Sequence, residues 1–264
     1  MSPPQDPDAA VARAARTGAE HARSLFRSGL AVETKSGKTD TVTRADREAQ
    51  REIVDVVREA DADAAVVGEE EEELKAVPET GAAWVIDPID GTNNYVRGGR
   101  TWTTSVCYVR DGEPVAAANA LPAVGDTYRT RRGGVALNGE PVKTSERADP
   151  ETCMVCPSVW WPMDRREEYA RATRAVVERF GDLRRPGSVQ AALAWTAAGE
   201  LDGVLTNVAV NPWDSLAGVH LVREAGGTVT DLEGERWTHD SRGLVASNGE
   251  IHEDVLAAAR DIET

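Results

Sequence analysis

The chain has 264 residues with 45 acidic and 30 basic side chains, and its formal net charge is −15 at pH 7. This acidity argues against a broad nucleic-acid-binding surface, and a hydrophobic share of 41% argues against disorder throughout. Apolar runs are only a few residues long and the first residues lack the features of a signal peptide, so we expect a cytoplasmic protein without a membrane partner.

Two helices are predicted at the beginning of the chain. Alanines and a few larger apolar side chains recur at helical spacing over Asp8–Ser28. The polar stretch Lys35–Asp40 then predicts a loop. Thr43 is placed to cap a second helix, which is expected to end at Ala60 and to carry Asp46 in its first turn.

Short apolar runs separated by turn residues predict a sheet in the rest of the first half. The runs are Ala64–Val67, Trp84–Ile86, Thr103–Val109, Val115–Ala120 and Asp126–Thr130. The dipeptides between or after them are Asp111-Gly112, Val124-Gly125 and Asn138-Gly139. Such dipeptides are typical of turns between antiparallel strands, so we expect an α+β region over residues 1–140.

In the second half, strands alternate with helices. Strands are expected at Cys153–Cys156, Val204–Thr206 and Leu244–Ala246, and helices over Arg165–Phe180, Trp213–Ala225 and Glu250–Ile262. The segment Val189–Ala198 adds another element to this alternation. Residues 141–264 are therefore predicted to form an α/β region that completes the functional site.

One short segment carries the strongest chemical signal. An apolar strand delivers Asp87 and Asp90 at its end, with Pro88 between them. Proline fixes φ and removes an amide donor, so the strand has to stop there and the turn can bring the two carboxylates together. The Ile89 carbonyl adds another oxygen, and Gly91 allows the backbone to approach an anion closely. These groups suit hard divalent metals and a phosphate that bridges them.

The whole string W-V-I-D-P-I-D-G-T at residues 84–92 resembles the first signature of the inositol monophosphatase superfamily, which consists of Mg²⁺-dependent, lithium-sensitive phosphatases. Further motifs resemble the family in the same order along the chain. They are V-T-R-A-D at 42–46, G-E-E at 68–70, G-S at 187–188, A-A-G at 197–199, D-G at 202–203, P-W-D at 212–214, A-G at 217–218 and E-A-G-G at 224–227.

The resemblance implies a fold and an assembly. The fold is a layered αβαβα sandwich of the sugar-phosphatase type, in which a mixed, mostly antiparallel sheet is followed by a second sheet with alternating helices. Relatives of this kind are usually homodimers, so the resemblance also implies a homodimer here.

The resemblance also implies roles for individual residues. The metal ligands would be Glu69, Asp87, Asp90, Asp214 and the Ile89 carbonyl, which would hold about two or three Mg²⁺ ions. Gly91 and Thr92 would bind the substrate phosphate through backbone amides. Asp46 would accept a hydrogen bond from the Thr92 hydroxyl, and this pair would orient the attacking water. Glu70 would lie behind the metal ligands or position a further water.

The implied reaction is the hydrolysis of a small phosphate monoester by a metal-activated water. Phosphate monoesters are dianions that bare carboxylates would repel, so Mg²⁺ has to invert the local charge. Inositol-preferring relatives carry a glutamate a short way before the second aspartate motif, where this sequence has Thr206 and Asn207. Inositol monophosphate, fructose 1,6-bisphosphate and other phosphorylated polyols or sugars therefore stay open as substrates. Four arginines are candidates for contacting a second phosphate: Arg97, Arg100, Arg184 and Arg185.

Two alternatives to this function remain. The first is a phosphatase of the same superfamily that acts on 3′-phosphoadenosine nucleotides or NADP. The second is a homologue that binds metal or sugar phosphate without catalysis.

Several of these residues also have a purely structural explanation. Asp46 and Asp214 could be acids in the first turn of a helix, where the helix dipole favours a carboxylate. The acidic run Glu71–Glu73 is expected to be a solvated loop. Cys153 and Cys156 have C-x-x-C spacing, but no second pair or paired histidines complete a zinc site, so we expect buried thiols.

The acidic surplus has its own interpretation. Only four of the 30 basic residues are lysines. Many carboxylates with few lysines are typical of halophilic proteins, whose self-repulsion is screened by concentrated salt. An ordinary acidic enzyme is the alternative.

Overall fold

A computed structural model of the chain describes residues 4–28, 32–34, 41–63, 65–70, 73–159 and 161–263. For residues 32–34 and 41–43 it describes the backbone only. The predicted loop Lys35–Asp40, the side chain of Thr43 and the first part of the Glu71–Glu73 run therefore lie outside the described residues.

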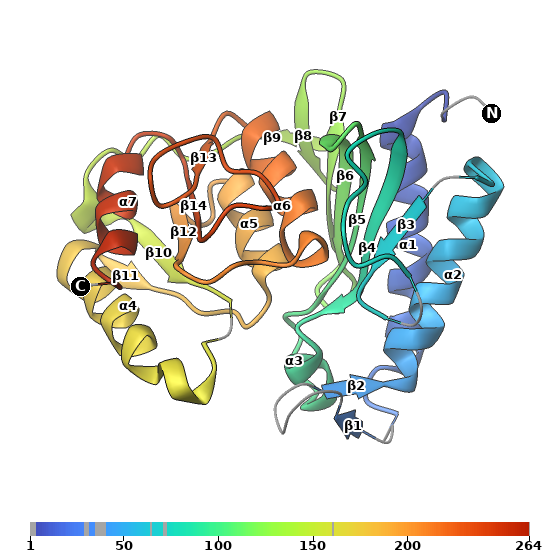
Figure 1. Cartoon of the computed structure of the whole chain (residues 1–264), viewed down its shortest axis with the longest axis horizontal. Helices are drawn as coiled ribbons and strands as arrows, with labels where there is room; N and C mark the ends of the chain where they lie inside the picture. Colours follow the sequence, from blue (N-terminus) through green and yellow to red (C-terminus); the bar gives the residue numbers. More distant parts are fainter. Residues whose placement is uncertain are drawn as a thin grey trace.

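Helices and sheets alternate in an αβαβα sandwich, as the resemblance implied (Figure 1). Helices α1 (Pro7–Leu25) and α2 (Arg44–Ala60) cover the outer face of a seven-stranded sheet. Helices α5 (Val189–Ala197) and α6 (Pro212–Glu224) lie between this sheet and a five-stranded one. Helices α4 (Arg166–Arg179) and α7 (His252–Arg260) cover the far side of the second sheet.

The first sheet has the strand order β3-β4-β5-β6-β7-β8-β9. Its strands are β3 (Ala65–Gly68), β4 (Ala82–Asp90), β5 (Thr103–Arg110), β6 (Glu113–Leu121), β7 (Asp126–Arg131), β8 (Gly134–Leu137) and β9 (Glu140–Val142). Only the β3–β4 pair is parallel among these described strands, so the predicted mixed, mostly antiparallel sheet is confirmed. At the predicted Asn138-Gly139 turn both residues have positive φ, 51° and 94°, which suits a tight hairpin.

The second sheet has the order β11-β10-β12-β14-β13. Its strands are β10 (Met154–Pro157), β11 (Asp182–Leu183), β12 (Gly203–Thr206), β13 (Thr228–Thr230) and β14 (Leu244–Ser247). Strand β10 runs parallel to β11 and β12, whereas β14 is antiparallel to β12 and β13. The sequence did not predict β11 or β13, because two or three residues are too few to show a period of two.

Short elements complete the described chain. They are β1 (Val32–Thr34), which pairs with β2 (Thr41–Thr43), helix α3 (Thr92–Val96), and 3₁₀ turns at Pro150–Thr152 and Met163–Arg165. Helix α1 begins after Asp6, whose side chain accepts a hydrogen bond from the Ala9 amide.

Separate apolar clusters fill the spaces between the layers. One lies between α1, α2 and the first sheet, another surrounds α5 and α6 between the two sheets, and a third lies beneath α4 and α7. All three cysteines are buried and free, so the expected buried thiols are confirmed. In the described part of the chain, none of the helices is long and apolar enough to cross a membrane.

The division of the chain near residue 140 stays a prediction. The first sheet ends at β9 and the second begins at β10, whereas α5 and α6 from the second half pack against strands of the first sheet.

Candidate metal centre

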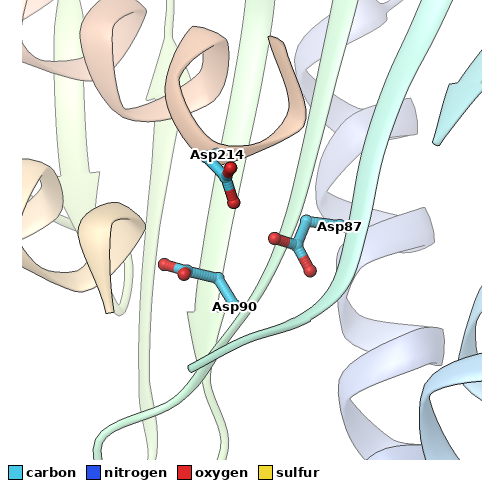
Figure 2. Close-up of side chains that lie close together, drawn as sticks. All are labelled: Asp87, Asp90 and Asp214. Atoms are coloured by element: carbon cyan, nitrogen blue, oxygen red, sulfur yellow. The ribbon is translucent and has the colours of Figure 1, made fainter. Parts of the chain in front are cut away.

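Three carboxylates converge where the first sheet meets the central helices. Oxygen atoms of Asp87, Asp90 and Asp214 lie within 4.8 Å of one another. Asp87 and Asp90 come from the end of β4, and Figure 2 shows the Asp214 side chain pointing toward them from the first turn of α6. The cluster therefore joins residues from the two halves of the chain.

An irregularity in β4 places two of these carboxylates together. Residues three apart in a regular strand would point to opposite faces. The prediction that the strand stops at Pro88 is wrong, because β4 continues to Asp90, which still pairs with Thr103 of β5. Instead, the pairing of β4 with β5 shifts between Asp87 and Asp90, around Pro88, which has no amide hydrogen to donate. The Pro88 carbonyl accepts a hydrogen bond from the Thr104 hydroxyl at 2.8 Å, and the Ile89 amide donates to Asp87 Oδ1 at 2.9 Å. These bonds hold the bend that aims both carboxylates into the site.

The Asp87 carboxylate is in an unfavourable environment for a negative charge. Its side chain is buried, and Oδ2 has no hydrogen-bond partner among the residues that the structure describes. Burial raises the pKa of Asp87 well above its ordinary value, and the negative charge of Glu69 adds the next largest effect. Three further carboxylates raise it in the same direction, those of Asp90, Asp214 and Asp46. A cation at this point would oppose these effects, because an opposite charge favours the ionised form of a carboxyl group.

Asp90 is held more firmly. Its Oδ2 atom accepts hydrogen bonds of 2.6 Å from both the Ser188 hydroxyl and the Gln190 amide at the beginning of α5. Burial nevertheless raises the pKa of Asp90 to about 7, because desolvation exceeds the lowering effect of these bonds. The sequence analysis missed this contact, since residues 98 positions apart share no spacing signal.

The donor set fits a hard divalent cation. Carboxylate oxygens are the ligands that Mg²⁺ prefers, and a cation would provide the partner that Asp87 Oδ2 lacks. Glu69, which directly follows β3, lies outside the group of three carboxylates. Its negative charge nevertheless raises the pKa of both Asp87 and Asp90. The structure thus brings together three of the four predicted carboxylate ligands.

The Glu69–Glu70 turn is held by two side chains that the sequence analysis did not identify. The buried Gln50 side chain donates to the Glu70 carbonyl at 2.6 Å and accepts from the Glu70 amide at 2.9 Å. Lys75 Nζ donates to the carbonyls of Gly68 at 2.7 Å and Glu69 at 3.0 Å. The same ammonium lies 5.6 Å from the ring centroid of Trp213, next to Asp214 in sequence. The turn is therefore fixed against both α2 and α6.

The predicted Asp46–Thr92 pair lies beside the carboxylates. The Thr92 hydroxyl is 3.2 Å from Asp46 Oδ1 and 3.0 Å from the Ile89 carbonyl oxygen. Since a hydroxyl has one hydrogen, it donates to one of these two acceptors at a time. Asp46 is buried in the first turn of α2 and Thr92 is the first residue of α3, so the beginnings of these two helices meet at this pair.

Gly91 directly precedes the short helix α3 and has φ of 95°, a conformation that favours glycine. A Cβ atom at this position would lie 3.1 Å from the Gly187 carbonyl and 3.2 Å from the Thr101 carbonyl. Both strain and crowding therefore require glycine where the resemblance expects phosphate-binding amides.

The residues expected to distinguish substrates are Asn207 and the four candidate arginines, and most of them contact other side chains or the backbone. Asn207 is buried, donates to the Glu168 carboxylate and accepts from Trp161 Nε1 at 2.8 Å. The guanidinium of Arg185 lies 5.0 Å from the ring centroid of Tyr169 and donates to the Val159 carbonyl. Of the other candidate arginines, Arg184 pairs with Asp182, and Arg97 and Arg100 are exposed.

Comparisons with known proteins agree with this geometry. The model of the inositol monophosphatase family matches residues 5–264. The chain is 36% identical over 237 residues to the fructose-1,6-bisphosphatase/inositol-1-monophosphatase of Thermotoga maritima, covering 88% of this chain and 87% of that protein. It is 30% identical over 241 residues to the inositol-1-monophosphatase of Bacillus subtilis, with 90% of each covered, and 31% identical over 255 residues to Nus factor SuhB of Escherichia coli K12, with 94% of each covered. Among solved structures, an IMPase of Thermotoga maritima matches with a TM-score of 0.86 at 32% identity, covering 96% of both chains.

Proposed function

Because the chain belongs to the inositol monophosphatase family, we propose that this phosphatase depends on Mg²⁺ and hydrolyses small phosphorylated polyols or sugars. The proposed substrates are inositol monophosphate and fructose 1,6-bisphosphate. The name of the Thermotoga maritima relative, which includes both activities, supports this choice. The observation that carries the proposal is the convergence of Asp87, Asp90 and Asp214, together with a buried Asp87 oxygen that lacks a hydrogen-bond partner among the described residues.

The resemblance to the family and the positions of these residues support the following proposed roles. The group that would hold Mg²⁺ comprises the carboxylates of Asp87, Asp90, Asp214 and Glu69 with the Ile89 carbonyl. Bound Mg²⁺ supplies charge neutralisation for the phosphate and lowers the pKa of water. When the Thr92 hydroxyl donates to Asp46, the lone pairs of its oxygen can accept a hydrogen bond from the attacking water and so orient it. The amides of Gly91 and Thr92 would bind the phosphate oxygens.

The test is phosphate release from a panel of monoesters, with Mg²⁺ and with Mg²⁺ removed by a chelator, at low and high KCl. The panel contains inositol monophosphate, fructose 1,6-bisphosphate, 3′-phosphoadenosine 5′-phosphate and NADP. We expect turnover of the first two in the presence of Mg²⁺. Preferred hydrolysis of either nucleotide would favour the alternative phosphatase, and no turnover of any monoester would favour a binding homologue.

A substitution at Asp90 makes the proposal sharper. Asp90→Asn keeps a side-chain oxygen that can accept from Ser188 but removes the negative charge, so we expect the rate of phosphate release to fall by roughly 100-fold or more. The circular dichroism spectrum should be unchanged. Asp55→Asn is the matched control, because Asp55 is exposed on α2 and the net charge changes equally. Near-normal turnover in Asp90→Asn would show that the ligand assignment is wrong.

A further inference from the structure

Gln190, in the first turn of α5, contacts Asp90 and the backbone next to Asp214. Its backbone amide donates to Asp90 Oδ2 at 2.6 Å. Its side chain donates from Nε2 to the carbonyl oxygen of Trp213 at 2.7 Å, and Trp213 directly precedes Asp214 in the first turn of α6. One residue thus contacts the Asp90 carboxylate itself and the peptide group that joins Trp213 to Asp214.

The carboxamide of Gln190 has a single orientation that satisfies its neighbours. Oε1 accepts from the Gly218 amide at 2.8 Å and from Asn119 Nδ2 at 2.9 Å, while Nε2 donates to the Trp213 carbonyl. Rotating the group by 180° would place its NH₂ against two donors and its oxygen against an acceptor. Since the Gln190 side chain is completely buried, water cannot compensate for such mismatches.

The packing of α5 against α6 depends on a glycine next to this side chain. A Cβ atom on Gly218 would lie 2.8 Å from Gln190 Oε1 and 2.5 Å from Leu193 Cβ. The glycine therefore allows α5 and α6 to pack closely enough for the carboxamide to reach the α6 backbone. Asn119 belongs to β6, and its Nδ2 also donates to the Gln190 carbonyl at 3.0 Å, so the junction is anchored on the first sheet.

We propose that Gln190 is a positioning residue that sets the separation of Asp90 and Asp214 and thereby the affinity of the site for Mg²⁺. This inference rests on the proposed function. Asp90 ends a strand of the first sheet and Asp214 begins a helix of the central layer, so their separation depends on how α5 and α6 sit against that sheet. Gln190 belongs to α5 and contacts β4, β6 and α6 through hydrogen bonds, which hold only in a narrow range of directions.

The experiment measures Mg²⁺ binding directly, by isothermal titration calorimetry of the metal-free protein. Gln190→Met preserves the length of the side chain but removes its three hydrogen bonds. We expect its Kd for Mg²⁺ to rise by about 10- to 100-fold, as is typical when a group that orients a metal ligand is lost. The Mg²⁺ concentration for half-maximal phosphate release should rise in parallel, whereas kcat at saturating Mg²⁺ should largely recover.

Thr196→Val is the matched control. Thr196 is completely buried in the same helix and donates one hydrogen bond, to the Ala192 carbonyl at 2.9 Å. This variant also loses a buried hydrogen bond in α5, but away from the metal centre, and we expect Mg²⁺ binding like that of the wild type. Gln190→Ala is a second test, because alanine favours the helix and water can enter the polar space it leaves. We expect the same weakening of Mg²⁺ binding.

The outcomes separate the two proposals. If the wild type itself does not bind Mg²⁺, the proposed function fails. If the wild type binds Mg²⁺ and both Gln190 variants bind it equally well, the positioning role is refuted while the function stands. If both Gln190 variants fail to fold without metal while Thr196→Val folds, Gln190 is a residue of the core and the positioning role is again refuted.

Discussion

At the scale of single residues, the geometry of the candidate metal centre is unfavourable for the stability of the metal-free protein. A buried polar atom without a partner costs about 1–3 kcal/mol, and Asp87 Oδ2 is such an atom. The neighbouring carboxylates add repulsion that raises the pKa of Asp87 further. The site is therefore expected to destabilise the metal-free protein and to stabilise the Mg²⁺-bound one.

The substitution Asp87→Asn separates these two effects. Asparagine removes the buried charge, and its amide can donate to a neighbouring carboxylate, so the Tm of the metal-free protein should rise, by about 2–4 °C for each kcal/mol gained. The additional rise in Tm on adding Mg²⁺ should be smaller than in the wild type. Differential scanning calorimetry with a chelator and with Mg²⁺ measures both.

Asp55→Asn again serves as the control for the change in net charge, since Asp55 is exposed on α2. It should melt like the wild type under both conditions. If Asp87→Asn lowers the Tm of the metal-free protein and keeps the full Mg²⁺ effect, the carboxylate is structural and the assignment of Asp87 to the metal site is wrong.

At the scale of elements, the ends of β3, β4 and the first turn of α6 have to meet for the site to exist. Lys75 contributes to this meeting, because its ammonium holds the carbonyls of Gly68 and Glu69 after β3 and lies over the Trp213 ring of α6. The Lys75 ammonium group therefore connects the turn that carries Glu69 to the helix that carries Asp214. The connection crosses between the two halves of the chain.

Lys75→Met should weaken this connection without unfolding the protein. The loss of hydrogen bonds worth about 0.5–1.5 kcal/mol each should raise the Mg²⁺ concentration for half-maximal activity, by roughly tenfold if about 1.4 kcal/mol is lost at the site. Measurements of phosphate release against Mg²⁺ concentration test this expectation. Lys143→Met is the same substitution at an exposed lysine that pairs with Glu146, and it should leave the Mg²⁺ curve unchanged. An unchanged curve in both variants would remove Lys75 from the account of the site.

At the scale of the whole molecule, the net charge of −15 remains to be explained after the metal centre is assigned. A few carboxylates are proposed to form the site, and most of the other described ones lie at least partly exposed at the surface. Their mutual repulsion destabilises the compact state in dilute buffer, and counter-ions reduce it.

We propose that the chain is adapted to concentrated salt, and we expect its Tm to rise with KCl in the presence of a chelator, which removes the contribution of the metal centre. Simple screening should be nearly complete by about 1 M, where the Debye length is about 3 Å. A salt-adapted protein should gain stability beyond that concentration. Full stability in dilute buffer would contradict the adaptation and favour an ordinary acidic enzyme.

Features formed by residues close together in the sequence were easier to predict than features that join residues far apart. The proximity of Asp87 and Asp90 was readable because Pro88 lies between them, although a register shift within β4 brings them together instead of the predicted turn. The hairpin at Asn138-Gly139 was readable because its φ angles suit these residues. Glu69 was expected among the ligands but lies outside the close group of three carboxylates. That difference could not be read from a motif, because it depends on how the turn after β3 is held against its neighbours.

The sequence by itself determined the family and the segments that carry the carboxylates, since both depend on short motifs, and the order of the layers followed from the resemblance to that family. Only the tertiary structure decided how Asp90 and Asp214 are held together. The bonds from Ser188 and Gln190 to Asp90, and from Gln190 to the backbone beside Asp214, join residues that no periodicity connects. The physical reason is that hydrogen bonds between layers depend on the packing of α5 against α6, which is a property of the folded chain.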